Sequence, residues 1–454
     1  MRKYFGTDGI RRIANSDLTP ELVYKVAKAG AYVLSKHLDN APTILIGRDT
    51  RISGTLIESA MTAGFLSFGA NVKLLGVVPT PVVAYLTKKM NADASVVISA
   101  SHNSYEFNGI KFFSNKGMKI SDEIEEEIEE IMDSGKLEEF SAESHKIGIS
   151  EICDGYVNEY IDFIKNVFVQ DINNNNKKDF VVGIDTANGA TYKIAEEIFN
   201  NLGIKYKIIN NNPNGLNINE KCGSTHLEKI SEFVKNNKLS MGIAYDGDGD
   251  RCLVVDENGK IVDGDIILSV FSKYLKENNK LKNNTLVATV MSNLGLNKFA
   301  KNNDINLKQT KVGDRYVLEE MLNNNYNIGG EQSGHIIFLD YNPTGDGIFT
   351  SLMLIKILLE KNIPLSKLCD IIKIYPQVLI NAKLNPSKKE LYENDEEIKN
   401  RILELENEFK DNGRILIRPS GTEPLVRVMI EGENQVYITQ QAKSLADLIE
   451  KKLN

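Results

Sequence analysis

Short hydrophobic runs alternate with helical stretches along the first third of this chain. Residues 43–46, 70–78 and 94–98 are apolar runs of strand length, each bounded by glycine, proline or polar residues. A helix is predicted to begin after Ser121, where isoleucines recur at helical spacing and glutamates take the opposite positions. This alternation predicts buried strands that are covered by amphipathic helices.

The same pattern restarts near residue 180 and again near residue 252. The predicted strands are residues 180–185, 239–245, 252–255 and 285–290, and the predicted helices are residues 191–202, 265–275 and 315–322. Repeated strand–helix units favour parallel sheets with right-handed crossovers. We therefore expect an α/β protein with three similar α/β domains, built on mixed or parallel sheets, at residues 1–150, 151–251 and 252–366.

The last part of the chain has a different order of predicted strands and helices. After Pro364 a strand-like run at 378–382 is followed by a charged helical stretch, by two strand-like runs at 414–417 and 426–430, and by a final helix. This order predicts a smaller C-terminal α+β domain at residues 367–454.

Composition and charge narrow the classes of function. The chain has 454 residues, of which 42% are hydrophobic and 26% are charged, as is typical of globular proteins. A net charge of -8 argues against nucleic acid or an anionic membrane as partner, so an anionic substrate would need a local arginine cluster. The N-terminus lacks an apolar signal core, and no run approaches the roughly 18 apolar residues of a membrane span. The four cysteines form no CxxC pair, and we expect idle thiols in a cytoplasmic protein.

The segment Tyr245–Arg251 is the strongest chemical signal, because Asp246, Asp248 and Asp250 alternate with glycines. Oxygen ligands at this density suit Mg²⁺ or Ca²⁺, and Arg251 adds a fixed cation. An EF-hand is the rival interpretation, since Glu257 falls at loop position 12 counted from Asp246. Arg251 stands where that loop needs glycine, and the flanks resemble strands, so the EF-hand is disfavoured.

A second candidate lies at the end of the strand 94–98, where Ser101 and His102 follow Ser99 and Ala100. Ligands bind at the carboxyl ends of strands in open parallel sheets, so Ser101 could be a nucleophile. The alternative is that Ser101 and Asn103 cap the next turn. A Ser-His hydrolase is disfavoured, because no G-x-S-x-G elbow surrounds Ser101. Lys111 could carry a proton, contact phosphate or be solvated.

Two further loops carry polar groups between glycines. Residues 329–335 hold Glu331, Ser333 and His335, which could bind sugar hydroxyls or could form a turn between 326–328 and 336–338. Residues 418–424, followed by Arg427, combine arginine with Ser, Gly and Thr, as in an anion nest. A surface hairpin turn is the alternative for the second loop.

Taken together and in this order, these segments resemble the α-D-phosphohexomutase superfamily. The matching motifs are residues 5–11 (FGTDGIR), 99–103 (SASHN), 246–251 (DGDGDR), 330–335 (GEQSGH) and 418–422 (RPSGT). Residues 213–219, 222–226 and 312–317 are similar to the glucosamine branch of the superfamily in particular. The chain departs from the family pattern at Ser104, where proline is usual, and this change is expected to loosen the loop backbone.

The resemblance implies four domains around a central cleft, each contributing one loop. Ser101 would carry a phosphoryl group, and Mg²⁺ would bridge its oxygen to Asp246, Asp248 and Asp250. Arg11 and Arg251 would offset charge during phosphoryl transfer, which mainly requires positioning and charge neutralisation. Lys111 and His335 would move the proton on and off the sugar hydroxyl.

The resemblance also implies the reaction, which interconverts glucosamine 6-phosphate and glucosamine 1-phosphate through a 1,6-bisphosphate. Glu331 and Ser333 would hold the sugar hydroxyls. The phosphate that is not reacting would be bound by Arg418, Ser420, Gly421, Thr422 and Arg427. Two alternatives stay open, a mutase for glucose or mannose phosphates and a non-catalytic sugar-phosphate sensor. Whether the chain forms a homodimer is also open.

Overall fold

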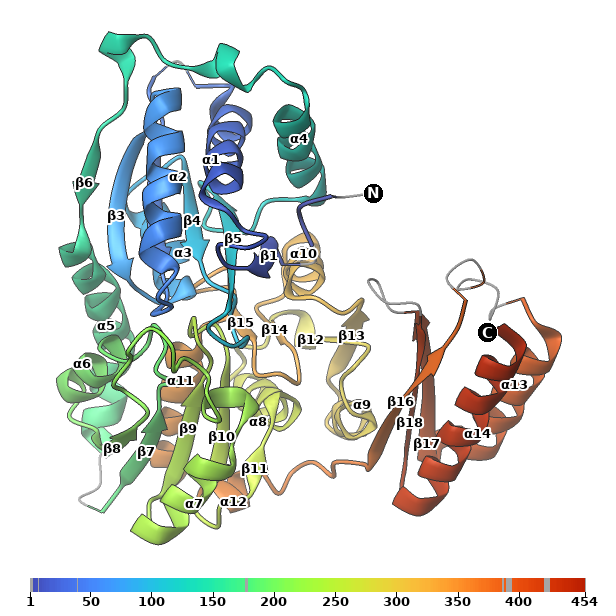
Figure 1. The fold of residues 1–454 in the computed structure, drawn as a ribbon. Helices are drawn as coiled ribbons and strands as arrows, with labels where there is room; N and C mark the ends of the chain where they lie inside the picture. The colour runs from blue at the N-terminus through green and yellow to red at the C-terminus, as the bar shows by residue number, and fades with distance from the viewer. Residues whose placement is uncertain are drawn as a thin grey trace. The chain divides into compact units, whose positions relative to one another are not determined.

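The structure, a computed structural model, describes residues 3–6, 8–38, 40–175, 179–385, 388, 394–419 and 425–453. The chain folds into two compact units (Figure 1). The first unit combines Met1–Val290 with Ile305–Asp370, and the second combines Met291–Asp304 with Ile371–Asn454.

The first unit begins with a six-stranded sheet of order β1-β5-β4-β2-β3-β6. Its strands are β1 (Ile10–Ile13), β2 (Thr43–Arg48), β3 (Asn71–Val77), β4 (Ala94–Ile98), β5 (Phe107–Ser114) and β6 (Ser150–Ile152). Its helices are α1 (Pro20–Ser35), α2 (Gly54–Phe68), α3 (Thr80–Lys89) and α4 (Asp122–Asp133). Strands β4, β2, β3 and β6 run parallel, whereas β5 is antiparallel to both of its neighbours. The sheet is therefore mixed, and β4 ends where the Ser101 segment begins.

A five-stranded sheet of order β11-β10-β9-β7-β8 follows. Its strands are β7 (Val181–Asp185), β8 (Lys205–Ile209), β9 (Met241–Tyr245), β10 (Cys252–Asp256) and β11 (Ile261–Val262). Its helices are α5 (Val157–Asn175), α6 (Ile194–Asn201) and α7 (Glu228–Asn237).

The prediction that residues 252–255 open the third unit is wrong. Cys252 pairs with Tyr245 and Asp256 pairs with Met241, so β10 returns antiparallel along β9. The acidic segment between these strands is short enough for a hairpin, whereas a parallel crossover needs about a dozen residues or more. The acidic segment is therefore the turn of a hairpin in the second sheet.

A third, four-stranded sheet has the order β13-β12-β14-β15. Its strands are β12 (Thr285–Thr289), β13 (Asn306–Thr310), β14 (Ile328–Gly330) and β15 (Ile336–Phe338), and its helices are α8 (Gly264–Glu277), α10 (Asp314–Asn324), α11 (Gly347–Lys361) and α12 (Leu365–Leu368). Strand β12 is parallel to β13 and β14, and β14 forms a hairpin with β15. Helix α11 is buried along most of its length and packs against α5.

The second unit is built on a three-stranded antiparallel sheet of order β16-β18-β17. Its elements are β16 (Gln377–Lys383), β17 (Gly413–Pro419), β18 (Leu425–Gly432), α9 (Leu294–Asn302), α13 (Glu396–Phe409) and α14 (Gln435–Leu453). Helix α9 joins this unit because its N-cap residue, Asn293, donates to O of Tyr375 at 2.9 Å and to Oε1 of Glu431 at 3.1 Å. The domain boundaries expected after residues 150 and 366 stay predictions.

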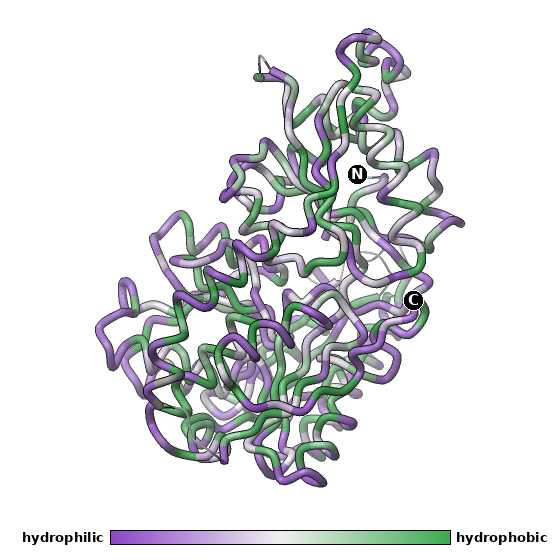
Figure 2. The backbone as a smooth tube through the Cα atoms, turned by 90° about the vertical axis from the view of Figure 1, so that its left-hand side faces the viewer, coloured by the Kyte–Doolittle hydropathy of each residue, from purple (hydrophilic) through white to green (hydrophobic). Residues whose placement is uncertain are grey.

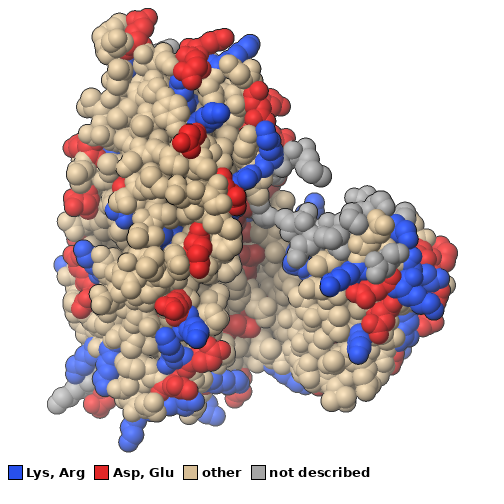
Figure 3. Space-filling view, in the orientation of Figure 1, with Lys and Arg blue, Asp and Glu red and all other residues tan. Residues whose placement is uncertain are grey.

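Hydrophobic and hydrophilic stretches alternate along the backbone (Figure 2). On the face shown in Figure 3, acidic and basic side chains are interspersed. Within the described part of the chain, no helix has both the length and the apolar character that a membrane span requires. All four cysteines are free thiols, as expected.

Candidate active site

Ser101 lies just beyond the carboxyl end of β4. Its side chain is buried, and its hydroxyl donates to Oδ2 of Asp246 at 2.6 Å. The backbone of Ser101 has a φ of 51°, in the left-handed region that residues other than glycine seldom adopt. Oγ of Ser99 accepts from the N–H of Ser101 at 2.9 Å and supports this turn. The loop therefore turns the Ser101 hydroxyl toward a carboxylate.

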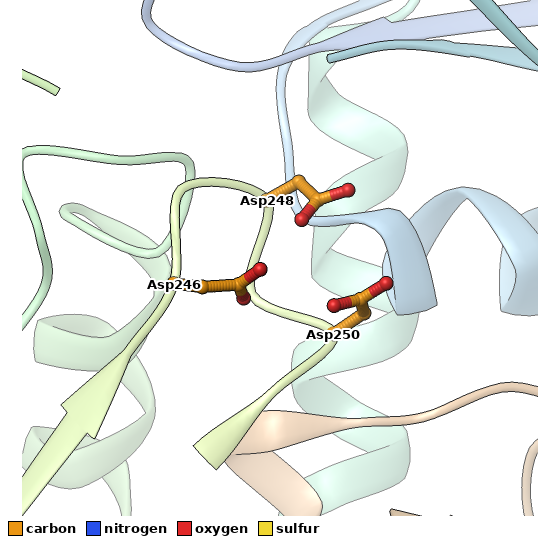
Figure 4. Close-up of side chains that lie close together, drawn as sticks. All are labelled: Asp246, Asp248 and Asp250. Carbon is orange, nitrogen blue, oxygen red and sulfur yellow. The ribbon is translucent and has the colours of Figure 1, made fainter. Parts of the chain in front are cut away.

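The three aspartates predicted to bind metal do lie together, in the turn between β9 and β10 (Figure 4). They are buried, and one carboxylate oxygen from each lies within 4.8 Å of the others. Burial and the neighbouring carboxylates raise the pKa of Asp246 well above its usual value. Oδ1 of Asp248 and Oδ1 of Asp250 have no hydrogen-bond partner among the described residues. This hard, anionic and incompletely satisfied donor set fits a divalent cation such as Mg²⁺.

Two glycines allow this geometry. Gly249 has a φ of 70°, which closes the tight turn. A Cβ atom at Gly247 would lie 2.5 Å from O of Ser101, closer than backbone and side chain can approach. Glycine at position 247 therefore lets the aspartate turn touch the segment that carries Ser101.

The EF-hand alternative is wrong. The aspartate turn connects the antiparallel strands β9 and β10, not two helices. Glu257, which would supply the last EF-hand ligand, instead accepts hydrogen bonds from the backbone N–H and the hydroxyl of Ser366.

Lys111, on β5, faces the same carboxylates. Its Nζ lies 2.9 Å from Oδ2 of Asp248, 3.1 Å from Oδ2 of Asp8 and 3.8 Å from Oδ2 of Asp250. Burial acts to lower the pKa of Lys111, but attraction by Asp248 and Asp8 outweighs it, and the pKa rises well above its usual value. Lys111 is therefore an ammonium group in this structure.

Two arginines complete the positive side of the site. Arg11 Nη2 lies 2.9 Å from Oδ2 of Asp8, and Arg11 Nη1 donates to Oδ1 of Asn103 at 3.2 Å. Arg251 Nη1 lies 3.3 Å from Nδ1 of His102. Burial and the nearby charges of Arg251 and Arg11 lower the pKa of His102 to about 4. The imidazole of His102 is therefore neutral near pH 7.

Glu331, Ser333 and His335 occupy the connection between β14 and β15, so the predicted turn is present and carries the predicted polar groups. Burial raises the pKa of Glu331. His335 Nε2 lies 3.4 Å from Oδ2 of Asp314 and 3.9 Å from Oδ2 of Asp250. Oγ of Ser333 and Nδ1 of His335 have no hydrogen-bond partner within the described ranges. These two buried atoms have hydrogen-bonding capacity to offer a ligand.

Some residues at the site were not predicted. Asp8 and His102 lie inside the motifs at residues 5–11 and 99–103, so the resemblance of these motifs could have identified them as site residues. Lys119 Nζ contacts Asp8 and lies 2.5 Å from Oδ2 of Asp314. Asp314 lies in residues 312–317, which were noted only for their resemblance to the glucosamine branch, and Lys119 stands in no recognised motif. The fold of the first unit brings the two side chains together.

In the second unit, Arg418 on β17 and Arg427 on β18 stand directly opposite each other. Burial and the charge of Arg427 lower the pKa of Arg418. Like charges at opposed positions of a sheet repel each other. Ser420, Gly421 and Thr422, the other predicted phosphate ligands, lie outside the described residues.

Four sequence models of one family match the chain in order. They are the phosphoglucomutase/phosphomannomutase alpha/beta/alpha domains I, II and III, at residues 2–139, 158–259 and 263–375, and the C-terminal domain of that family, at residues 379–448. The chain therefore belongs to the phosphoglucomutase/phosphomannomutase family and is an enzyme of this mutase class.

Individual relatives narrow the class. A phosphoglucosamine mutase from Clostridium beijerinckii is 53% identical over 454 residues, which is 100% of each chain. A solved phosphoglucomutase/phosphomannomutase family protein from Burkholderia thailandensis superposes with a TM-score of 0.82 at 21% identity, covering 98% of this chain and 97% of the other. The N-acetylphosphoglucosamine mutase of Aspergillus fumigatus, solved with GlcNAc-6P and magnesium, gives a TM-score of 0.71 at 16% identity, covering 100% and 96%. These two structures share the fold with this chain.

Proposed function

We propose that this enzyme interconverts glucosamine 6-phosphate and glucosamine 1-phosphate through a phosphorylated Ser101. The observation that carries this proposal is the 2.6 Å contact between the Ser101 hydroxyl and Asp246 within the buried aspartate cluster. The choice of sugar rests on the full-length relative named phosphoglucosamine mutase. The product would supply the synthesis of UDP-N-acetylglucosamine and cell-wall precursors, and free thiols support a cytoplasmic location.

The proposed cofactor is Mg²⁺, held by Asp246, Asp248, Asp250 and an oxygen of phosphorylated Ser101. The unpartnered carboxylate oxygens support this assignment, because a buried acceptor without a partner is costly. When bound, Mg²⁺ neutralises the negative charge on phosphoryl oxygens during transfer.

The phosphoryl group passes from Oγ of Ser101 to the free hydroxyl of the sugar phosphate. The bond between Oγ and phosphorus breaks as the sugar oxygen bonds to phosphorus, and the sugar hydroxyl loses its proton. The resulting 1,6-bisphosphate turns over in the site and returns its other phosphate to Ser101. We assign His335 to accepting the proton of the sugar hydroxyl, and the ammonium group of Lys111 to supplying a proton to Oγ of Ser101 as its bond to phosphorus breaks. The two roles are exchanged when the phosphoryl group returns to Ser101. Arg11 and Arg251 offset the charge of the phosphoryl group.

Binding would place the sugar against the β14–β15 connection, where Glu331 and Ser333 bind its hydroxyls in either orientation. The burial of Glu331 and the unpartnered Oγ of Ser333 support this placement. The non-reacting phosphate would meet Arg418, Ser420, Gly421, Thr422 and Arg427.

The test is the variant Ser101→Ala, with Ser104→Ala as its control. Ser104 is exposed in the same loop; its carbonyl oxygen accepts from Arg51, and its hydroxyl contacts the exposed carboxylate of Glu106. Ser101→Ala should lose nearly all mutase activity and should no longer gain the mass of a phosphate group. Ser104→Ala should keep its mutase activity and should still gain that mass. Unchanged turnover by Ser101→Ala would overturn the phosphoserine proposal.

The choice of sugar has its own test. Initial rates with glucosamine, glucose and mannose phosphates, measured on the same preparation, should be highest for the glucosamine compounds. A preference for mannose 1-phosphate would refute this substrate, and the absence of turnover with all three would favour a non-catalytic sensor.

A further inference from the structure

We infer that Arg51 and Asn219 are positioning residues that hold the Ser101 loop, defined as residues 99–106, in the geometry that presents Ser101. The inference rests on the proposed function only where it predicts turnover, because the contacts themselves belong to the folded chain. Neither residue carries a group that the proposed reaction needs.

The guanidinium group of Arg51 binds carbonyl oxygens along this loop. Arg51 is buried, and its Nη2 donates to O of Ser101 at 3.0 Å and to O of Asn103 at 2.8 Å. Its Nη1 donates to O of Ser104 and, at 3.0 Å, to O of Phe107, the first residue of β5. A planar guanidinium presents its donors in a fixed fork, so these acceptors are held in one arrangement.

Arg51 is in turn held by Asp49. Arg51 Nε donates to Oδ2 of Asp49 at 2.8 Å, and the hydroxyl of Ser99 donates to the same oxygen at 2.7 Å. Because Oγ of Ser99 also accepts from the N–H of Ser101, a continuous chain of hydrogen bonds runs from Arg51 to the backbone of Ser101. The loop is therefore supported at its start and along its carbonyl groups.

Asn219, in the connection between β8 and α7, binds the same loop. Its Nδ2 donates to O of Ser101 at 2.8 Å and to O of Asn103 at 2.9 Å, the two oxygens that Nη2 of Arg51 also binds. A Cβ atom at Gly247 would lie 2.9 Å from Nδ2 of Asn219, so the aspartate turn lies against the same side chain. Asn219 thus fixes the Ser101 loop relative to the turn that carries the aspartates.

These contacts constrain a loop that lacks the proline expected after Asn103. Serine at position 104 leaves the backbone more conformational freedom than proline would. The carbonyl group of Ser104 is bound by Arg51, and the preceding carbonyl, of Asn103, is bound by both Arg51 and Asn219. Side-chain hydrogen bonds therefore supply the constraint that the residue type does not.

The experiment uses the full chain and the variants Asn219→Gly and Asn219→Asp. Asn219 has a φ of 59°, which glycine and aspartate tolerate, so neither change forces the backbone. Glycine removes the donor, and aspartate points a carboxylate oxygen at two carbonyl oxygens. The control is Asn237→Asp, which replaces an amide that donates to O of Phe233 at 3.0 Å on helix α7.

Hydrogen exchange of peptides covering the Ser101 loop, without substrate, should accelerate by about tenfold in Asn219→Gly, because two hydrogen bonds are lost. Acceleration should be larger in Asn219→Asp and absent in the loop of the control. The kcat per folded enzyme should fall by about 10–100-fold while KM for the sugar phosphate changes little, because a misplaced nucleophile slows transfer without touching the sugar contacts.

Unchanged hydrogen exchange of the Ser101 loop in both variants would overturn the positioning role of Asn219, whatever the mutase activity of the variants. Faster exchange with an unchanged kcat, or a loss confined to KM, would overturn its link to turnover. A wild-type chain that lacks mutase activity would defeat the proposed function, while the exchange measurement would still decide whether Asn219 holds the loop.

Discussion

Replacing Lys111 with methionine tests how charge is balanced at the aspartate cluster. Lys111 Nζ lies 2.9 Å from Asp248 and 3.1 Å from Asp8, and the Lys111 side chain is 2% exposed. The change removes a buried positive charge but keeps most of the apolar stem. We expect the variant to be less stable without Mg²⁺ and to regain much of that stability when Mg²⁺ is added.

The structure sets the scale of this effect. Removing one partner of a buried ion pair costs about 3–5 kcal/mol, because the other charge is left uncompensated. Asp8 is partly exposed and has other cationic neighbours, so we take the lower end, about 3 kcal/mol. If Mg²⁺ restores that amount, its binding to the variant should be about 100-fold tighter than to the wild type.

Calorimetric titration measures the affinity for Mg²⁺, and thermal unfolding with and without Mg²⁺ measures the stability that the ion restores. The control is Lys28→Met, since Lys28 is also buried but donates to Oγ of Ser141 at 2.7 Å in the α1 region. Lys28→Met should lower stability equally with and without Mg²⁺. Equal losses for Lys111→Met under both conditions, together with unchanged Mg²⁺ affinity, would refute the reasoning.

Two further predictions concern packing and close approach. Tyr160→Phe should lower the free energy of unfolding by about 2 kcal/mol, because the Tyr160 hydroxyl donates to both carboxylate oxygens of the buried Asp346, at 2.9 and 2.8 Å. Burial raises the pKa of Tyr160 well above its usual value, so its contribution to stability is complete below about pH 10 and is lost as the pH rises further. In thermal unfolding against pH, the wild type should lose more stability above about pH 10 than the variant, which keeps the other buried tyrosines such as Tyr245. Gly247→Ala should lower kcat by about 100-fold, because the added methyl group would displace Ser101. Gly155→Ala should leave kcat unchanged, because the added atom meets nothing within 4 Å. Equal rates for the two alanine variants would contradict the steric argument.

The strands and the aspartate cluster could be predicted from the sequence because their signals are local. Apolar runs of strand length identified β4 at its observed bounds, and three aspartates between glycines marked the turn after β9. The direction of a strand has no such signal. Residues 252–255 were recognised as a strand, but the same pattern fits a new unit and a hairpin return, and only pairing with β9 decides between them.

Contacts between segments that are far apart in the sequence could not be predicted either. Asn219 lies in a segment noted only for its resemblance to one branch of the superfamily, yet its side chain binds the loop that carries Ser101. Arg51 follows an ordinary strand end, and its acceptors are backbone carbonyls, which leave no trace in residue type. Positioning residues of this kind are visible only when the partner loops are placed against each other.

The balance of charge also explains why the proposed reaction needs a metal ion in addition to the fixed cations of the site. The Ser101 hydroxyl already lies 2.6 Å from Asp246, so a phosphoryl group on Ser101 brings about two further negative charges to a buried carboxylate. Lys111 is engaged by Asp248 and Asp8, and Arg251 lies against His102 and 3.9 Å from Asp250. The fixed cations are thus largely matched by carboxylates before phosphorylation. The added charge therefore requires a further cation, and by linkage that cation must bind the phosphorylated enzyme more tightly than the unphosphorylated one.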